Sequence, residues 1–234
     1  LAALAPVAVL PGRALAQFLP AGHPHASLTA QRSGVNQCLP DWKNVPTRTA
    51  PQHEVLYKTT HGQPNGLALT KNPNELWVLD QGKGGWMTLT DVRNGSVIRE
   101  FQTDVVGPSG LVIDADNVMW IASTHNTLMV AVDANTGEVK WAVPLGLYEE
   151  FPQGKQLLGN SGSAGPTVTA GGLVFVGATN DKRFRAFDSK TGKQLWEAML
   201  GGNANANPMS YRGRSGKQYV AINAGGTIVA YALP

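Results

Sequence analysis

The sequence has little cysteine and little charge. Cys38 is the one cysteine among 234 residues, and Asp, Glu, Lys and Arg together make up 15% of the chain. A single thiol excludes an intramolecular disulfide, a CxxC redox pair and a zinc site built on several thiolates. The formal net charge is only +3, and basic residues do not cluster with aromatic ones, which argues against a nucleic-acid surface.

Long apolar runs are also missing. No segment approaches the ~20 apolar residues that a membrane-spanning helix needs, so we expect no membrane span. The apolar stretch Leu1–Leu10 is followed by Ala14-Leu15-Ala16, which resembles a secretion signal with its A-x-A cleavage site. We therefore predict a signal-peptide remnant over residues 1–16 and a periplasmic or secreted protein.

The rest of the chain falls into two parts. Residues 17–52 are rich in Pro, His, Ser, Thr and Gln without an apolar period, which predicts an extended leader. Residues 53–234 are periodic and predict one repeat domain. Because 42% of the residues are hydrophobic, a chain of this length can bury a sizeable core.

A polar turn with an aspartate and a glycine recurs between pairs of strands. The pattern A-x-D-x-x-T-G-x-x-x-W runs from Ala131 to Trp141 and from Ala186 to Trp196, and residues 89–95 hold a shorter copy. Such an aspartate accepts hydrogen bonds from turn amides, and the glycine adopts a positive φ before the next strand. The spacing therefore indicates a repeated hairpin.

Two more strands precede each turn. The innermost-strand candidates are residues 64–69, 108–113, 165–168 and 207–210. The second-strand candidates are the apolar segments 76–79, 118–122, 173–178 and 219–224. Four copies of this unit predict an all-β fold, a β-propeller of four four-stranded blades.

The fourth copy reaches residues 227–234 without a following outermost strand. Residues 53–58 resemble the outermost strands at 138–141 and 194–196 and directly precede the first innermost strand. Our hypothesis is that this N-terminal strand completes the fourth blade and closes the ring, which would protect both sheet edges.

Candidate site residues come from the rim, because loops and inner-strand starts surround the central channel of a propeller. The candidates for cofactor or ligand binding are His61, Asn65, Asp80, Ser109, Ser123, His125, Asn126, Asn180 and Asp181. The histidines could bind a metal or act as a general base, or be solvated loop residues. The aspartates could be bases or calcium ligands, or could tie down turns. No residue is assigned as catalytic, and no metal ligand is assigned.

Asn203, Asn205 and Asn207 alternate along a stretch that opens with two glycines. They could present amides on one side of a loop. We interpret the stretch as a flexible surface loop, since clusters of Gly, Asn and Pro between strands are typical of loops.

The C-terminal half resembles a known family. Residues 169–181, 184–196, 216–226 and 229–234 closely resemble the C-terminal blades of PQQ-dependent alcohol and glucose dehydrogenases. In that family the repeated tryptophan docks between blades, which assigns Trp141 and Trp196 to structure. Residues 64–69 with 75–78, and residues 108–116, resemble gluconolactonase-like and streptogramin-lyase-like propellers instead.

This resemblance implies an exported quinoprotein oxidoreductase that acts on an alcohol or sugar with PQQ and calcium. Propellers of that family are eight-bladed, and their cofactor, calcium and catalytic groups come mostly from blades without a counterpart here. A homodimer of two four-bladed chains is one way to complete such a site. The alternatives are a non-catalytic propeller that binds a small molecule or a protein partner, and a metal-dependent lactonase or lyase using Asn65, Asp80 and His125.

Overall fold

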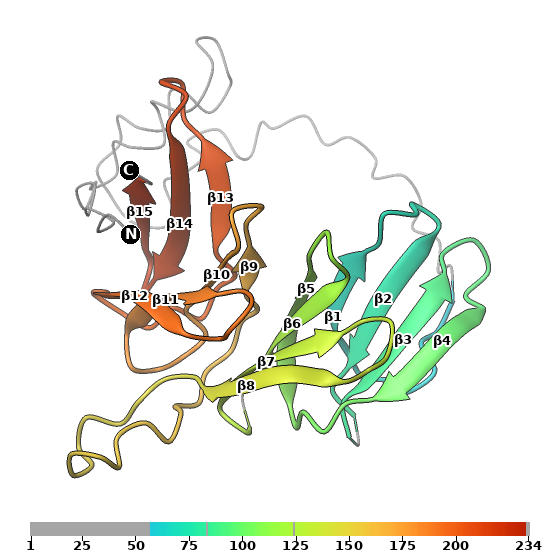
Figure 1. Cartoon of the computed structure of the whole chain (residues 1–234), viewed down its shortest axis with the longest axis horizontal. Coiled ribbons are helices and arrows are strands. Elements are labelled where there is room, and N and C mark those ends of the chain that lie inside the picture. The colour runs from blue at the N-terminus through green and yellow to red at the C-terminus, as the bar shows by residue number, and fades with distance from the viewer. Residues whose placement is uncertain (1–56, 83, 124, 233–234) are drawn as a thin grey trace, which may run out of the picture.

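The structure, a computed structural model, describes residues 57–82, 84–123 and 125–232. Within these ranges the chain forms antiparallel sheets that follow one another along the sequence, and it forms no helix (Figure 1). The described residues accordingly include no helix that is long and apolar enough to cross a membrane. The predicted all-β propeller fold is confirmed, and we number its blades 1 to 4.

Three blades have four described strands, each paired with the next in sequence. Blade 1 consists of β1 (Pro64–Leu69), β2 (Glu75–Asp80), β3 (Trp86–Asp91) and β4 (Val97–Gln102). Blade 2 consists of β5 (Pro108–Ile113), β6 (Val118–Ser123), β7 (Leu128–Asp133) and β8 (Val139–Pro144). Blade 3 consists of β9 (Thr167–Val168), β10 (Leu173–Val176), β11 (Arg183–Asp188) and β12 (Gln194–Met199).

Blade 4 has three described strands. These are β13 (Met209–Arg212), β14 (Gln218–Ala224) and β15 (Thr227–Ala232). The predicted fourth strand of this blade depends on residues 53–56, which lie outside the described residues. Ring closure by that strand therefore stays a prediction.

The hairpin turns form as their sequence pattern predicts. The carboxylate of Asp133 accepts hydrogen bonds from the backbone N–H groups of Asn135 at 2.8 Å and Thr136 at 3.3 Å. Gly137 and Gly192 have φ values of 81° and 70°, a left-handed conformation that costs glycine little. Each turn thus joins the third and fourth strands of its blade.

These turns also receive the outermost strand of the preceding blade. The indole of Trp141 on β8 lies so close to Gly192 that a Cβ there would stand 2.7 Å from the ring, and its Nε1 donates to the carbonyl of Ser189 at 3.2 Å. Phe101 on β4 covers Gly137 in the same way, while Arg99 donates to the carbonyl of Asn135 at 2.6 Å. The structural role that the resemblance gave to Trp141 is confirmed by these contacts.

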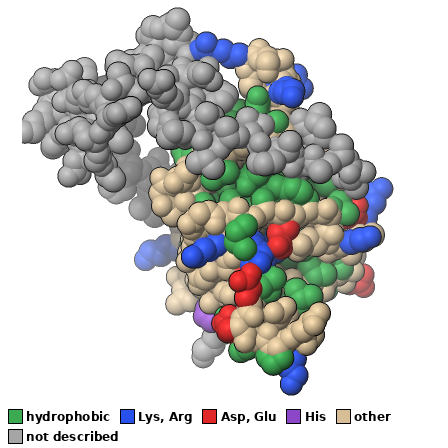
Figure 2. All heavy atoms as spheres, turned by 90° about the vertical axis from the view of Figure 1, so that its left-hand side faces the viewer, with side chains coloured by type: hydrophobic (Ala, Val, Ile, Leu, Met, Phe, Trp, Pro, Cys, Tyr) green, Lys and Arg blue, Asp and Glu red, His purple; other side chains and the backbone are tan. Residues whose placement is uncertain are grey.

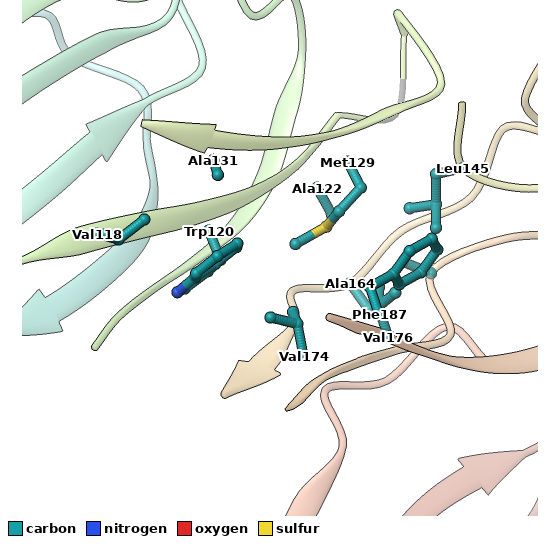
Figure 3. Packing of buried hydrophobic residues seen from close by; sticks show 11 residues of the cluster. Val118, Trp120, Ala122, Met129, Ala131, Leu145, Ala164, Val174, Val176 and Phe187 are labelled. Carbon is teal, nitrogen blue, oxygen red and sulfur yellow. The ribbon is translucent and has the colours of Figure 1, made fainter. Parts of the chain in front are cut away.

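A hydrophobic core lies between each pair of consecutive blades. Between blades 2 and 3, Trp120 on β6 and Met129 on β7 face Val174 on β10 and Phe187 on β11 (Figure 3). A second cluster joins blades 1 and 2, and a third, which includes Trp196 as a partly buried member, joins blades 3 and 4. The apolar faces of the strands are therefore buried against neighbouring blades.

Replacing Gly192 by alanine should destabilise the protein by about 2–4 kcal/mol, because the new Cβ adds steric overlap with Trp141 to the strain of a positive φ. Gly216 provides the control: its φ is 81° and a Cβ there would meet nothing within 4 Å. Gly216→Ala should cost only the strain, about 1–2 kcal/mol. Urea denaturation measures both, and equal losses would contradict the docking contact.

Candidate functional site

The sequence-predicted site residues lie along one rim of the blades, where innermost strands begin and second strands end. Pro64 at the start of β1 pairs with Asp80 at the end of β2, and Pro108 pairs with Ser123 in the same way. On this rim, polar side chains of one blade bond the backbone of the next.

Asp80 is used by the backbone of its own blade. Asp80 is buried, with 1% of its surface exposed. Its two carboxylate oxygens accept hydrogen bonds from the backbone N–H groups of Gln63 at 2.7 Å and Gly82 at 2.8 Å. A carboxylate that is buried and bonded in this way fixes a loop.

Ser123 performs the same task in blade 2. Its hydroxyl donates to the carbonyl of Val106 at 2.6 Å and accepts from the N–H of Asn126 at 3.1 Å. The amide of Asn126 donates to the carbonyl of Asp104 at 3.4 Å. His125 is exposed and lies against Gly107, leaving no room for a Cβ there. Ser123 and Asn126 therefore join the start of the blade to the end of its second strand.

Asn65 and Ser109 connect neighbouring blades. The amide of Asn65 donates to the carbonyl of Pro108 at 2.9 Å, so blade 1 is tied to blade 2. The hydroxyl of Ser109 lies 2.8 Å from the carbonyl of Ala164, just before blade 3. Both side chains remain neutral hydrogen-bonding groups on the rim.

Asn203, Asn205 and Asn207 lie exposed on the loop between β12 and β13, as the sequence predicted, and their side chains bond neighbouring loops. The amides of Asn203 and Asn205 donate to the side-chain oxygen of Asn180 at 3.1 and 3.4 Å. Asn207 accepts from the N–H of Gly165 at 2.5 Å. Alternate residues of an extended segment point to the same side, so the three side chains hold the entry to blade 4 against blade 3.

Asp181 is part of a buried ion pair. Its carboxylate pairs with Arg185, whose side chain is 2% exposed, and also accepts hydrogen bonds from the Thr179 hydroxyl at 2.7 Å and the Leu147 N–H at 3.0 Å. Burial alone would raise the pKa of Asp181, but the bonds from Arg185 and the others hold that pKa below its ordinary value of 3.8. Asp181 is therefore ionised at neutral pH and is poorly suited to act as a base.

A long loop between blades 2 and 3 is anchored to this ion pair. Arg183 pairs with Glu149 of the loop and with Glu197 on β12, the latter at 2.8 Å between Nε and Oε1. Glu197 also lies 3.2 Å from Nε of Arg185. Figure 2 looks onto the side of the molecule that carries this loop and shows acidic and basic side chains adjoining one another. The ion pair between Arg183 and Glu149 thus holds the loop against blade 3.

His61 belongs to an aromatic pocket on the rim of blade 1. Its ring stacks on Trp86 with 4.4 Å between centroids and 8° between planes, and its Nε2 lies 3.2 Å from a carboxylate oxygen of Glu100. Together with Gly62, Gln63 and Gly82, the two rings line a pocket of about 460 Å³. The sequence predicted His61 alone, because its partners come from β3 and β4 and are brought to it only by strand register.

A larger groove of about 730 Å³ is lined by residues of β1 and β2 of blade 1, by residues of β5 of blade 2 and by Asn207 before β13. Its lining includes three neutral polar side chains at or just before the starts of innermost strands, Asn65, Ser109 and Asn207, together with apolar side chains. The full set is Tyr57, Thr59, Pro64, Asn65, Gly66, Leu67, Leu76, Val78, Ser109, Gly110, Leu111 and Asn207.

The described residues do not by themselves fit PQQ and a metal ion. PQQ is a flat quinone that carries several carboxylates, which call for Arg or Lys donors, and calcium calls for several oxygen ligands. The groove is lined by neutral side chains, and in the aromatic pocket Glu100 lies beside the rings. Nowhere do three or more described His, Cys, Asp or Glu residues gather as metal ligands.

The fold and the site together define a class. Sheets of four antiparallel strands, cores between consecutive blades and turns that receive an aromatic from the preceding blade are the features of a β-propeller built from one repeat. The profile of the PQQ "Glucose/ethanol/alcohol dehydrogenase, beta-propeller domain" matches residues 29–220, and the chain belongs to this family. The predicted resemblance to quinoprotein dehydrogenases is confirmed.

Individual proteins agree with this assignment. The quinate/shikimate dehydrogenase (quinone) of Acinetobacter baylyi is 42% identical over 121 residues, which are 45% of this chain and 15% of that protein. The quinoprotein glucose dehydrogenase of Gluconobacter oxydans is 34% identical over 209 residues, which are 79% of this chain and 25% of that protein. The matched part of this chain thus spans a quarter or less of these relatives.

Among solved structures, a europium-containing methanol dehydrogenase superposes with a TM-score of 0.51 and 18% identity, over 73% of this chain and 40% of that chain. At this level of identity the similarity supports the propeller fold alone.

Proposed function

We propose that this chain provides propeller blades to an exported quinoprotein oxidoreductase that oxidises an alcohol or a sugar. The observation that carries the proposal is the family match across residues 29–220. The names of the relatives point to hydroxylated substrates such as quinate and glucose. Export rests on the sequence pattern of residues 1–16, which lies outside the described residues.

The described blades would serve as a framework in this proposal. They tie the rim together through Asp80, Ser123 and Asn180, whose side chains bond other parts of the rim. The groups that hold PQQ and a metal would have to come from outside the described residues. The chemistry that PQQ supplies when bound is two-electron oxidation of the substrate.

The test uses the whole chain. Purified protein is mixed with PQQ and calcium, or with PQQ and a lanthanide, and is then passed over gel filtration. We expect quinone absorbance to stay with the protein and an artificial dye to be reduced when quinate, glucose or a simple alcohol is added. Protein without PQQ is the control. Loss of all quinone from the protein would contradict the proposal.

A second candidate is a non-catalytic propeller that binds a small neutral molecule or a protein partner. The observation that favours it is the neutral lining of the groove, where Asn65, Ser109 and Asn207 offer hydrogen bonds without charge. A rise in melting temperature with quinate or glucose in the absence of PQQ would support this candidate.

The lactonase or lyase alternative gains no support from the described residues. Its metal would need Asn65, Asp80 and His125 to converge. Both oxygens of Asp80 instead accept backbone hydrogen bonds, and the amide of Asn65 is directed to the carbonyl of Pro108.

A further inference from the structure

The aromatic pocket on the rim of blade 1 has no role in the proposed oxidation. It has a volume of about 460 Å³ and is lined by His61, Gly62, Gln63, Gly82 and Trp86. This volume lies within the range of small-molecule sites, roughly 300–1,000 Å³, which combine apolar or aromatic walls with a few polar groups. The pocket shares no lining residue with the larger groove. It is therefore a separate candidate for ligand binding.

The backbone around the pocket is held in place by Asp80. The buried carboxylate accepts hydrogen bonds from the N–H groups of Gln63 and Gly82, and the N–H of Gln81 donates to the carbonyl of Gln63 at 2.8 Å. At Gly62 a Cβ would meet nothing within 4 Å, so the space above this residue is open. A site whose walls are ordered before binding loses less entropy when a ligand enters.

Two stacked rings form a wall of the pocket. The imidazole of His61 lies on the indole of Trp86, and its Nε2 lies 3.2 Å from a carboxylate oxygen of Glu100. A carboxylate can only accept hydrogen bonds, so in the neutral imidazole the proton lies on Nε2 and Nδ1 is an acceptor. The stack and the hydrogen bond together fix the orientation of the imidazole.

The polar groups around the pocket are suited to hydroxyl partners. Within the described part of the chain, the side-chain amide of Gln63 makes no hydrogen bond, so it offers a donor and an acceptor. The Nδ1 of His61 and the carboxylate of Glu100 offer further acceptors. A hydroxyl group satisfies all of these because it both donates and accepts.

The charge around the pocket disfavours anions. No lysine or arginine is among the described lining residues, and Glu100 adds a negative charge beside the rings. An anionic ligand would therefore meet repulsion without a compensating cation.

We propose that this pocket binds a neutral sugar. The C–H groups of the sugar ring pack against His61 and Trp86, whose ring faces carry partial negative charge. The sugar hydroxyls bond the amide of Gln63, Nδ1 of His61 and the carboxylate of Glu100. Glucose fits this description, whereas quinate carries a carboxylate and does not. The proposal does not depend on PQQ or on the proposed oxidation.

The first test compares the two ligands. Glucose and quinate are titrated into the whole chain without PQQ, and binding is followed by calorimetry. We expect the Kd of glucose to be lower than that of quinate by roughly tenfold or more, because the carboxylate of quinate would face Glu100. Lys83 follows Gly82 and lies outside the described residues, and an attraction from it would favour quinate. Absence of glucose binding, or quinate binding as tight as glucose, would overturn the proposal.

The second test locates the bound sugar. His61→Phe keeps a ring on Trp86 but removes both ring nitrogens, and it should raise the Kd of glucose by roughly fivefold or more. Glu100→Gln should also weaken glucose binding, and it should strengthen quinate binding because the repulsion disappears. Glu150→Gln is the matched control, since Glu150 is exposed on the loop between blades 2 and 3, and it should leave both Kd values unchanged. If neither pocket variant differed from this control, the sugar would bind elsewhere and the proposal would be wrong.

Discussion

Replacing Asp181 by alanine is expected to lower the free energy of unfolding by about 3–5 kcal/mol, because it leaves a buried guanidinium without its main carboxylate. The side chains of Arg185 and Asp181 are 2% and 3% exposed, so water cannot replace the lost partner. Glu197 remains 3.2 Å from Arg185 and should keep the loss from being larger. Urea denaturation monitored by tryptophan fluorescence gives the value.

Two variants make this result specific. Asp188→Ala removes a turn aspartate that bonds Lys190 and Thr191 near the surface and should cost much less. Asp181→Ala combined with Arg185→Met removes both charges and should recover part of the loss, since the buried charge disappears. If Asp181→Ala costs no more than Asp188→Ala, the ion pair does not stabilise the fold as described.

Acid gives a second readout of the same pair. The pKa of Asp181 in the folded protein lies below its ordinary value of 3.8, so its stabilising contribution is complete above that value. The contribution is lost as the pH falls through the folded-state pKa. Below pH 3.8 the stability of Asp181→Ala should therefore fall less steeply than that of the unchanged protein.

Replacing Trp141 by alanine should cost about 3–4 kcal/mol of unfolding free energy, because a half-buried indole between blades 2 and 3 is lost. The ring contacts Trp120 at 5.2 Å between centroids and covers Gly192, and its N–H bonds the carbonyl of Ser189. Trp141→Phe keeps an aromatic ring and removes the N–H, so it should cost only about 1 kcal/mol. Urea denaturation compares the two variants.

Coupling to the turn glycine checks the reason for that loss. In a Trp141→Ala background the Cβ of Gly192→Ala would no longer meet the indole, so the two changes should cost less together than the sum of their separate effects. Additive losses would mean that Trp141 does not stabilise the protein through this turn.

Local patterns were enough to predict the repeat. The segments expected as innermost strands at 64–69 and 108–113 have the same limits as β1 and β5, because each is opened by a proline and carries apolar side chains. The Asp-to-Gly hairpins formed as expected, since their hydrogen bonds join residues a few positions apart. Such features depend on neighbours in sequence, which a single sequence contains.

Contacts across strands and blades could not be predicted in the same way. Trp86 and Glu100 meet His61 through the pairing of β3 with β4, and one shifted residue in that register would separate them. Arg185 gave no sequence signal of burial, because arginine on a strand is usually exposed. The sequence predicted Asp181 as a candidate ligand-binding residue but did not predict its ion pair with Arg185.

Rim residues such as Asp80 show why a polar residue in the right place need not be a ligand. Rim loops carry backbone N–H and carbonyl groups that must be satisfied when they are buried. The nearest carboxylate or hydroxyl satisfies them first, as Asp80 does for Gln63 and Gly82. A sequence pattern places the side chain at the rim, but it does not show whether that side chain bonds the backbone or is left to bind a ligand.

The glycine and aromatic pairs between blades bear on how such proteins change in evolution. Phe101 packs on Gly137 and Trp141 packs on Gly192. In both cases an aromatic residue of an outermost strand contacts the hairpin glycine of the next blade. If a repeat were gained or lost by recombination, the blades on either side of it would still make this contact. Variation in blade number would then need few compensating substitutions at these contacts.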